Sequence, residues 1–296
     1  MKKITWGILA LCALFCGLLF ASAQDMQSDM HQMPKVIVIM REFLKPGKAG
    51  LPHEKTESLF VQAFQKAKWP TYYLGMESLS GKSRALFLTR YDSFEAWEKD
   101  TMAVAKNAAL SAAISHASEV DGALLDDLDQ GVFVARPDLS LRPNPDLAHV
   151  HYVDISVFHT RQGHAGEFED ATKMVMAAIS KSNPDAHWGA FQGAYGTSDG
   201  TYLFITQRKS AAEIDSDYAH DKDFMSAIGG EEGMKKLDEM SAHSIESNES
   251  NLFMINPRMS YMSEDVIKAD PDFWRPKMPA APAAPKKTEE KPTGNQ

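Results

Sequence analysis

Cysteine is almost missing from this sequence, and its absence removes several kinds of chemistry. The 296 residues include two cysteines, Cys12 and Cys16, and both lie in an N-terminal segment with the features of a signal peptide. The mature chain is therefore expected to contain no cysteine. This excludes a disulfide scaffold, a thiol nucleophile, thiolate-bound zinc and an iron–sulfur cluster, so an ordinary hydrophobic core must stabilise the fold.

Long apolar runs are also missing after the N-terminal segment. Lys2 and Lys3 precede an uncharged run over residues 4–20, and Ala21-Ser22-Ala23 supplies the small residues of a cleavage site. The pattern predicts a signal peptide over residues 1–23 and export to the periplasm or the extracellular space. Because no later stretch is long enough to cross a bilayer, we expect no membrane insertion after cleavage.

Positive charge is scarce in the chain. The formal net charge is −9, with 31 Lys and Arg against 40 Asp and Glu. Cleavage of residues 1–23 makes the chain more negative still, because the segment carries two lysines and no acidic residue. An acidic chain without a basic stripe argues against nucleic acid and against anionic membrane surfaces as partners. A small molecule is therefore the class of partner that the composition allows. The composition predicts no oligomeric state.

Two halves of the chain resemble each other in the order and spacing of their residues. Corresponding segments are Gly47-Lys48-Ala49-Gly50 with Gly163-His164-Ala165-Gly166, residues 85–89 with 202–206, Ser93 with Ser210, and Asp100 with Asp217. Since chance similarity does not keep its order along whole halves, the pattern indicates a tandem repeat.

Each half is predicted to read β-α-β-β-α-β. In the first half, the apolar runs 35–44 and 85–89 predict strands, and apolar residues recur at helical spacing between them. The second helical stretch is expected to continue to about Asp129, with one break, before a short strand at residues 132–134. The second half repeats this order from a strand over residues 149–159 to a short strand at residues 252–254.

The repeat defines the predicted domain organisation. The segments are a signal peptide (1–23), a flexible leader (24–33), module 1 (34–141), a linker (142–148), module 2 (149–262), a C-terminal extension (263–276) and a disordered Pro-, Ala- and Lys-rich tail (277–296). The order of elements in each module is ferredoxin-like. Such a module leaves one face of its sheet uncovered, and two copies in one chain can cover each other. The expected fold is therefore α+β, with two tandem ferredoxin-like modules that close into a barrel with helices outside.

The turn from the first strand to the first helix carries a family resemblance. The strand ends in Arg41-Glu42-Phe43-Leu44 and runs into Lys45-Pro46-Gly47-Lys48, and the helix carries His53-Glu54-Lys55. These residues resemble the dimeric α/β-barrel superfamily, above all its NIPSNAP-like and antibiotic-monooxygenase-like members and their tandem exported bacterial versions. The resemblance covers residues 34–141 and 149–262, and it implies an intramolecular dimeric α/β-barrel. The superfamily includes haem-handling proteins, cofactor-free oxygenases and isomerases, so it implies no single chemistry.

The second half departs from this motif. It has Thr160-Arg161-Gln162-Gly163 where the first half has the lysine and proline residues of the turn. We therefore expect the two halves to differ in any site that they carry.

Polar and aromatic residues near the strand ends are candidates for a ligand site. Arg41 and Glu42 end an otherwise apolar strand, so one of them is expected to point inward, where a charge needs a partner or a ligand. A structural ion pair between the two residues is the alternative. Aromatic walls with few polar groups suit a planar, mostly apolar molecule. The candidate ligand-binding residues are Arg41, Glu42, Tyr73, Arg90, Trp188 and Arg208, and the candidate catalytic residues are His53 and His159.

Three functions are compatible with these patterns. The first is an exported protein that binds a small, mostly apolar molecule between its two sheets. The second, implied by the resemblance, is a cofactor-free or haem-dependent monooxygenase in which His53 or His159 is the base or the axial ligand, and Arg41 and Arg208 hold an anionic group. The third is a structural or interaction protein of the cell envelope that binds partners through its tail at 277–296.

The sequence predicts no metal site. His149 and His151 alternate on a predicted strand, so both would point to one face, about 7 Å apart. His159 lies too far along that strand to join them, and metal sites in proteins usually show three ligands. No cofactor is therefore expected, and haem is the one that the resemblance leaves open.

Overall fold

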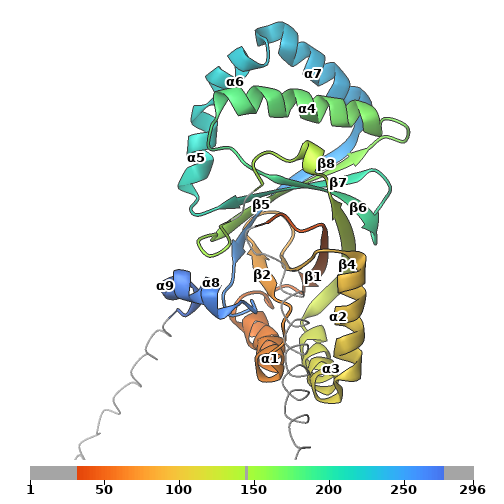
Figure 1. The fold of residues 1–296 in the computed structure, drawn as a ribbon, viewed down its shortest axis with the longest axis vertical. Helices are drawn as coiled ribbons and strands as arrows, with labels where there is room; N and C mark the ends of the chain where they lie inside the picture. Colours follow the sequence, from red (N-terminus) through yellow and green to blue (C-terminus); the bar gives the residue numbers. More distant parts are fainter. Residues whose placement is uncertain (1–31, 144–145, 277–296) are drawn as a thin grey trace, which may run out of the picture.

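The computed structural model describes residues 32–143 and 146–276 (Figure 1). The signal peptide, almost all of the leader and the tail at 277–296 lie outside the described residues, so the expectations for them stay predictions. Within the described ranges, no helix is both long enough and apolar enough to cross a membrane.

The two halves contain the same order of strands, separated by helices. The elements of the first half are β1 (Val36–Leu44), α1 (Leu51–Ala67), β2 (Tyr73–Ser78), β3 (Arg84–Tyr91), α2 (Phe94–Lys106), α3 (Ala108–Gly122) and β4 (Leu125–Ala135). Those of the second half are β5 (Tyr152–Thr160), α4 (Ala165–Ser182), β6 (Gly189–Tyr195), β7 (Thr201–Arg208), α5 (Ala212–Ala219), α6 (Asp221–Ala227), α7 (Gly230–Ser244) and β8 (Ile245–Ile255), followed by α8 (Glu264–Ala269) and α9 (Pro271–Trp274).

The strands form one closed barrel in the order β1-β3-β2-β8-β5-β7-β6-β4. The order β4-β1-β3-β2 of the first half recurs as β8-β5-β7-β6 in the second, and every pairing is antiparallel. Two junctions close the ring, with Met76 opposite Ile255 and Val134 opposite Gln192. The predicted α+β class and the predicted barrel are confirmed. Among the described strands, closure leaves no free sheet edge on which another chain could add a strand.

The helices lie outside the barrel on two opposite sides. In Figure 1, α1, α2 and α3 cover the sheet of the first half, and α4 to α7 cover the sheet of the second half. β1 is therefore covered on both faces, which explains why it is an almost continuous apolar run in the sequence.

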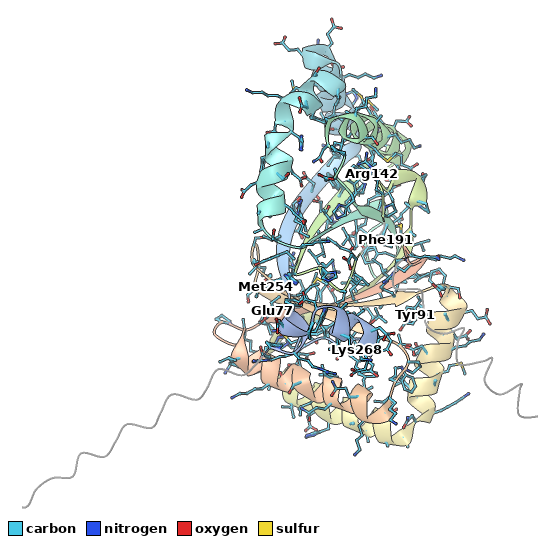
Figure 2. The ribbon with its side chains drawn as sticks, turned by 60° about the vertical axis from the view of Figure 1, so that its left-hand side comes forward. Glu77, Tyr91, Arg142, Phe191, Met254 and Lys268 are labelled. Carbon is cyan, nitrogen blue, oxygen red and sulfur yellow. The ribbon has the colours of Figure 1, made fainter. Side chains whose placement is uncertain are left out.

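Apolar side chains fill the space between the two sheets. Phe191, labelled in Figure 2, belongs to this core, together with Ile37, Ile39, Leu74, Met76, Leu86, Leu88, Phe133, Val153, Ile155, Leu203, Ile205, Phe253 and Ile255. Leu147 and Trp274 join the same core, so the predicted linker and the C-terminal extension also pack against the barrel. Full burial of such side chains contributes about 1.5–3 kcal/mol each before the cost of chain entropy.

The last strand of each half is longer than predicted. The helical stretch of the first half ends at Gly122, not at about Asp129, and β4 begins at Leu125 instead of residue 132. β8 begins at Ile245, whereas the prediction began that strand at residue 252. The first part of β4 pairs with β1 but exposes acidic side chains, as at Asp127. Its composition is therefore that of a solvated helix end, and pairing with β1 decides that it is a strand.

Candidate functional site

A cavity lies between α1, α3 and the outer face of the first sheet. Its volume is about 340 Å³. Most of its wall is apolar, with Val38, Met40, Phe60, Phe64, Phe87 and Ile114 among the lining residues. The polar part of the wall includes Glu42, Glu57, Asp121 and Tyr73. We call this space the first-half cavity.

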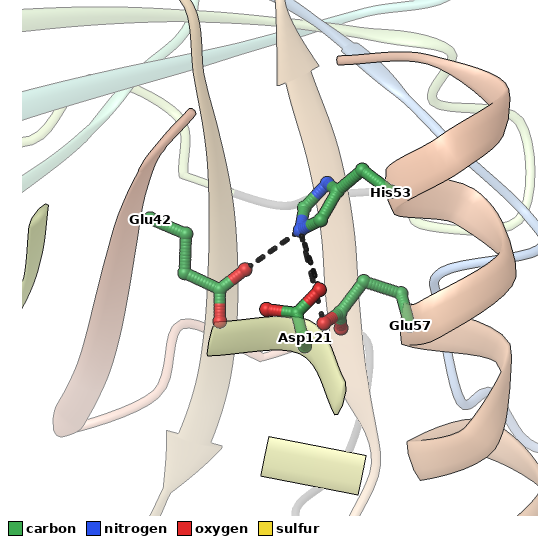
Figure 3. A group of neighbouring side chains, drawn as sticks. All are labelled: Glu42, His53, Glu57 and Asp121. Atoms are coloured by element: carbon green, nitrogen blue, oxygen red, sulfur yellow. Dashed lines mark hydrogen bonds and ion pairs between the residues drawn. The ribbon is translucent and has the colours of Figure 1, made fainter. Parts of the chain in front are cut away.

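Three carboxylates surround one imidazole at the wall of the first-half cavity. His53 Nε2 lies 2.9 Å from Glu42 Oε2, 3.5 Å from Asp121 Oδ1 and 3.8 Å from Glu57 Oε1. Figure 3 shows the three acidic groups converging on the same ring nitrogen. We call Glu42, His53, Glu57 and Asp121 the four-residue cluster.

Local structure explains how three of these side chains meet. Side chains of a strand alternate between its faces, so β1 directs Ile39 and Arg41 into the barrel and Met40 and Glu42 towards the helices. His53 and Glu57 are four residues apart on α1, which places them on one face of that helix.

Asp121, on the last turn of α3, is the member from a distant part of the sequence. Thr56, on the same helix as His53, makes a hydrogen bond to Asp121 Oδ1. This contact ties the end of α3 to α1 and orients the carboxylate.

Burial controls the charge of the cluster. His53 is 0% exposed, Glu57 and Asp121 are 2% exposed, and Glu42 is 3% exposed. Desolvation, with smaller contributions from Glu42 and Asp121, raises the pKa of Glu57 to about 10. Burial also raises the pKa of Glu42, against the hydrogen bond from His53. Glu57 thus keeps at neutral pH a proton that an exposed carboxyl would have lost.

Tyr73 adds a hydroxyl to the wall of the cavity. It is the first residue of β2, and its ring packs edge-on against Phe64 and Phe87. The hydroxyl is buried and has no hydrogen-bond partner among the described residues. Desolvation first, and then the charges of Glu57 and Glu42, raise its pKa well above the usual value, so it remains a donor. A buried donor without an acceptor is rare in folded proteins and calls for an explanation.

The structure brings three of the predicted site residues together, namely Glu42, His53 and Tyr73. Arg41 points to the other side of the sheet, where it pairs with Asp129. The expected alternative of an ion pair between Arg41 and Glu42 is therefore wrong, because adjacent strand residues face opposite sides of the sheet.

Three more predicted residues line other spaces. Arg90 and Trp188 line a cavity of about 60 Å³ inside one end of the barrel, and a cavity of about 80 Å³ lies by Arg41 at another position of the interior. The space between the sheets, where the ligand was predicted, therefore holds mainly packed side chains. Arg208 lines an outer groove of the second half, where it pairs with Asp217 at 2.7 Å and Asp154 at 3.4 Å.

The predicted pair of strand histidines does not form. β5 begins at Tyr152, so His149 and His151 precede it. His149 Nδ1 lies 2.7 Å from Asp146, while His151 Nε2 lies 2.9 Å from Asp270. Each imidazole has its own acidic partner, because the chain before β5 is not extended as a strand.

Sequence reasoning missed Glu57 and Asp121. Glu57 had a local signal, since it follows His53 by one helical turn on a predicted helix. Asp121 had none, because its contact with Thr56 spans 65 residues of chain.

The second half has no copy of the cluster at the corresponding positions. The repeat places Phe158 at the position of Glu42, Glu169 at that of His53 and Lys173 at that of Glu57. Phe158 packs in an aromatic group with Phe168. Glu169 pairs with Arg136 at 2.7 Å instead of with a histidine. The prediction that the halves differ is confirmed for these positions.

No family model and no curated protein sequence matches the chain. Solved structures with a similar fold include a candidate monooxygenase from Fusobacterium nucleatum subsp. nucleatum, with 12% identity, a TM-score of 0.49 and coverage of 74% of this chain and 91% of that one. A mutant chlorite dismutase from Candidatus Nitrospira defluvii in complex with cyanide has 10% identity, a TM-score of 0.46 and coverage of 82% and 98%. A haem-binding protein from Thermus thermophilus has 13% identity, a TM-score of 0.44 and coverage of 80% and 95%.

These neighbours are proteins of the dimeric α/β-barrel type. Similarities at this level concern the fold and do not transfer a reaction or a ligand. The function of this chain is therefore argued from its own residues.

Haem held by a histidine needs an imidazole nitrogen that faces a space large enough for the porphyrin. His53 is fully buried and turns Nε2 to Glu42, and His159 Nδ1 lies 3.0 Å from Thr201 Oγ1. Three of the polar residues at the wall of the first-half cavity, Glu42, Glu57 and Asp121, are acidic, whereas haem carries acidic propionates of its own. The described residues of this site therefore fit a proton or a small cation better than haem.

Proposed function

We propose that the protein binds a small, mostly apolar molecule in the first-half cavity. The observation that carries the proposal is an apolar cavity of about 340 Å³ into which a few polar groups converge. This combination is typical of ligand sites, in which apolar walls supply affinity and a few polar groups fix orientation. The ligand is thus expected on the helix side of the first sheet.

The hydroxyl of Tyr73 indicates one feature of the ligand. It is buried without a partner among the described residues, so a bound molecule with a hydrogen-bond acceptor would satisfy it. Beyond this acceptor, the ligand needs apolar surface for contact with Phe60, Phe64 and Ile114. A neutral aromatic compound with one oxygen or nitrogen acceptor has both properties.

Binding of the neutral fluorescent probe N-phenyl-1-naphthylamine tests the proposal. Thr89 lines the first-half cavity from β3, and Thr206, its counterpart in the repeat, lines the outer groove of the second half. We expect Thr89→Trp to fill the cavity and to weaken probe binding at least about tenfold, or about 1.4 kcal/mol. Thr206→Trp should bind the probe as the unmodified protein does.

Two outcomes would overturn this location. If only Thr206→Trp lost probe binding, the ligand site would lie in the second half. If both variants bound the probe as the unmodified protein does, neither outer site would be the ligand site. Near-ultraviolet circular dichroism of each variant checks that the fold is retained.

An oxygenase of the barrel type is the second function expected from the sequence. In the expected mechanism His53 or His159 is the base or the axial ligand, but His53 turns its Nε2 atom into the four-residue cluster and His159 Nδ1 lies 3.0 Å from Thr201 Oγ1. The geometry therefore favours ligand binding, and oxygen consumption during turnover would be the measurement that favours the oxygenase.

We also infer that the two halves are tandem ferredoxin-like modules of NIPSNAP-like ancestry. The recurrence of the order β4-β1-β3-β2 as β8-β5-β7-β6 supports the duplication. The turn motif at residues 45–48 supports the ancestry.

Export of the chain is likewise an inference. It rests on the signal-peptide pattern of residues 1–23. The intact mass of the protein from the exported fraction of its own host tests it, since cleavage before Gln24 removes those residues. Deletion of residues 277–296 tests whether the tail binds partner proteins, because an interaction that depends on the tail is then lost.

A further inference from the structure

We propose that Glu42, His53, Glu57 and Asp121 bind one divalent transition-metal ion beside the first-half cavity. The set supplies one imidazole nitrogen and three carboxylate groups from β1, α1 and α3. The proposal goes beyond ligand binding in the cavity, because the ion would have its own donor set in the protein.

The separations within the cluster match those of ligands around a metal. All four donor atoms lie within 4.8 Å of one another. With bond lengths of about 2.0–2.2 Å, the ligands of a tetrahedral ion are separated by about 3.3–3.6 Å. The distances from His53 Nε2 to the three carboxylates are 2.9, 3.5 and 3.8 Å, which is within a few tenths of an ångström of this range. Carboxylate oxygens up to 4.8 Å apart would close by about 1 Å around the ion.

An unpartnered oxygen points to a ligand that belongs in the cluster. Glu57 is 2% exposed, and its Oε1 atom is buried without a hydrogen-bond partner among the described residues. Figure 3 shows the Glu57 carboxylate directed towards His53 and Asp121. Within the described ranges, no lysine or arginine forms an ion pair with Glu42, Glu57 or Asp121. A divalent cation would satisfy the free oxygen and neutralise charge that no basic side chain balances.

The donor set indicates which ions fit. Imidazole suits zinc, iron, cobalt and nickel, and carboxylates suit harder ions such as manganese. One nitrogen with three carboxylates therefore favours Mn²⁺, Fe²⁺, Co²⁺ or Zn²⁺ over copper(I), which prefers sulfur ligands.

Access and stoichiometry follow from the position of the cluster. Glu42, Glu57 and Asp121 line the first-half cavity, which gives the ion a route of entry and an open side. Phe158 and Lys173 stand at the corresponding positions of Glu42 and Glu57 in the second half. One ion per chain is therefore expected.

Titration of the metal-free full-length mature protein with Co²⁺ tests the proposal. Visible absorbance reports cobalt bound by protein groups, and native mass spectrometry counts the ions. We expect saturation at one Co²⁺ per chain, a higher melting temperature with the ion, and reversal by EDTA. Glu57→Gln and Asp121→Asn keep the shape of each side chain but remove its charge, and each should weaken binding at least tenfold.

Glu169→Gln is the matched control, because Glu169 occupies the position of His53 in the second half, and it should bind Co²⁺ like the unmodified protein. Either of two results would overturn the proposal: no saturable binding at one ion per chain, or unchanged binding in both Glu57→Gln and Asp121→Asn. If either Glu57→Gln or Asp121→Asn does not fold, Co²⁺ binding by the other variant tests the proposal. Asp121→Asn should lose Co²⁺ and retain the neutral fluorescent probe, so the metal site and the ligand site can fail separately.

Discussion

Replacement of Asp100 by alanine should destabilise the first half strongly. Asp100 lies on α2 and is 7% exposed. Its carboxylate accepts hydrogen bonds from Trp69 Nε1 at 2.9 Å, Thr71 Oγ1 at 2.6 Å and the Tyr91 hydroxyl at 2.9 Å. One side chain thus fixes the end of α1, the segment before β2 and the end of β3.

The magnitude follows from these three bonds. A hydrogen bond to a charged group contributes about 1.5–3 kcal/mol, and a buried donor left without an acceptor costs about 1–3 kcal/mol. The Trp69 and Tyr91 donors are buried, whereas the Thr71 hydroxyl can turn to water. We therefore expect Asp100→Ala to lower the free energy of unfolding by about 3–5 kcal/mol. Asp100→Asn keeps an oxygen acceptor and should cost about half as much.

Urea unfolding at neutral pH, followed by far-ultraviolet circular dichroism, measures the effect. The repeat supplies a comparison in Asp217, whose side chain is 42% exposed and accepts from Arg208 at 2.7 Å and from Asn183 Nδ2 at 3.0 Å. Because this carboxylate is partly solvated and Arg208 keeps Asp154 as a second partner, Asp217→Ala should cost less, about 1–2 kcal/mol. Equal losses for Asp100→Ala and Asp217→Ala would refute the reasoning, as would a loss below about 1 kcal/mol for Asp100→Ala.

Two further predictions concern the first half. A Cβ atom at Gly75 would lie 2.3 Å from the Met259 carbonyl oxygen, so Gly75→Ala should destabilise by about 2 kcal/mol or more in urea unfolding, whereas Gly122→Ala, with open space around its Cβ, should cost nothing. In metal-free protein, Glu57 has a folded pKa of about 10 against its usual value of 4.5, so its contribution to stability is fully present below about pH 4.5 and is lost as the pH rises towards 10. Glu57→Gln should therefore flatten the decline of the free energy of unfolding between about pH 5 and 9, by at most about 1.4 kcal/mol per pH unit, and parallel pH curves for the two proteins would contradict the assignment.

Local patterns were sufficient to predict most of the fold. Helical spacing, apolar runs and turn glycines act over a few residues, so they predicted the order of strands and helices in both halves. The sequence did not predict the start of β4, because its acidic residues are exposed and only their pairing with β1 makes them part of a strand.

The candidate site was predicted in part. Glu42, His53 and Tyr73 stood out because polar groups in apolar strands and at a helix start are conspicuous. Whether Arg41 or Glu42 faces the helices depends on the register of β1 in the barrel, which shifts of one residue would reverse. The residues next to Arg41 and Glu42 in the sequence do not indicate that register.

Patterns in the sequence were enough to predict the α+β class and the closing of two halves into a barrel, because both depend on short-range periodicity and on apolar faces that must be covered. Only the packing of whole elements places a cavity between α1, α3 and the first sheet and brings Asp121 to His53 at its wall. Such contacts depend on how whole elements pack, and side chains distant along the chain converge only after the helices have docked on the barrel.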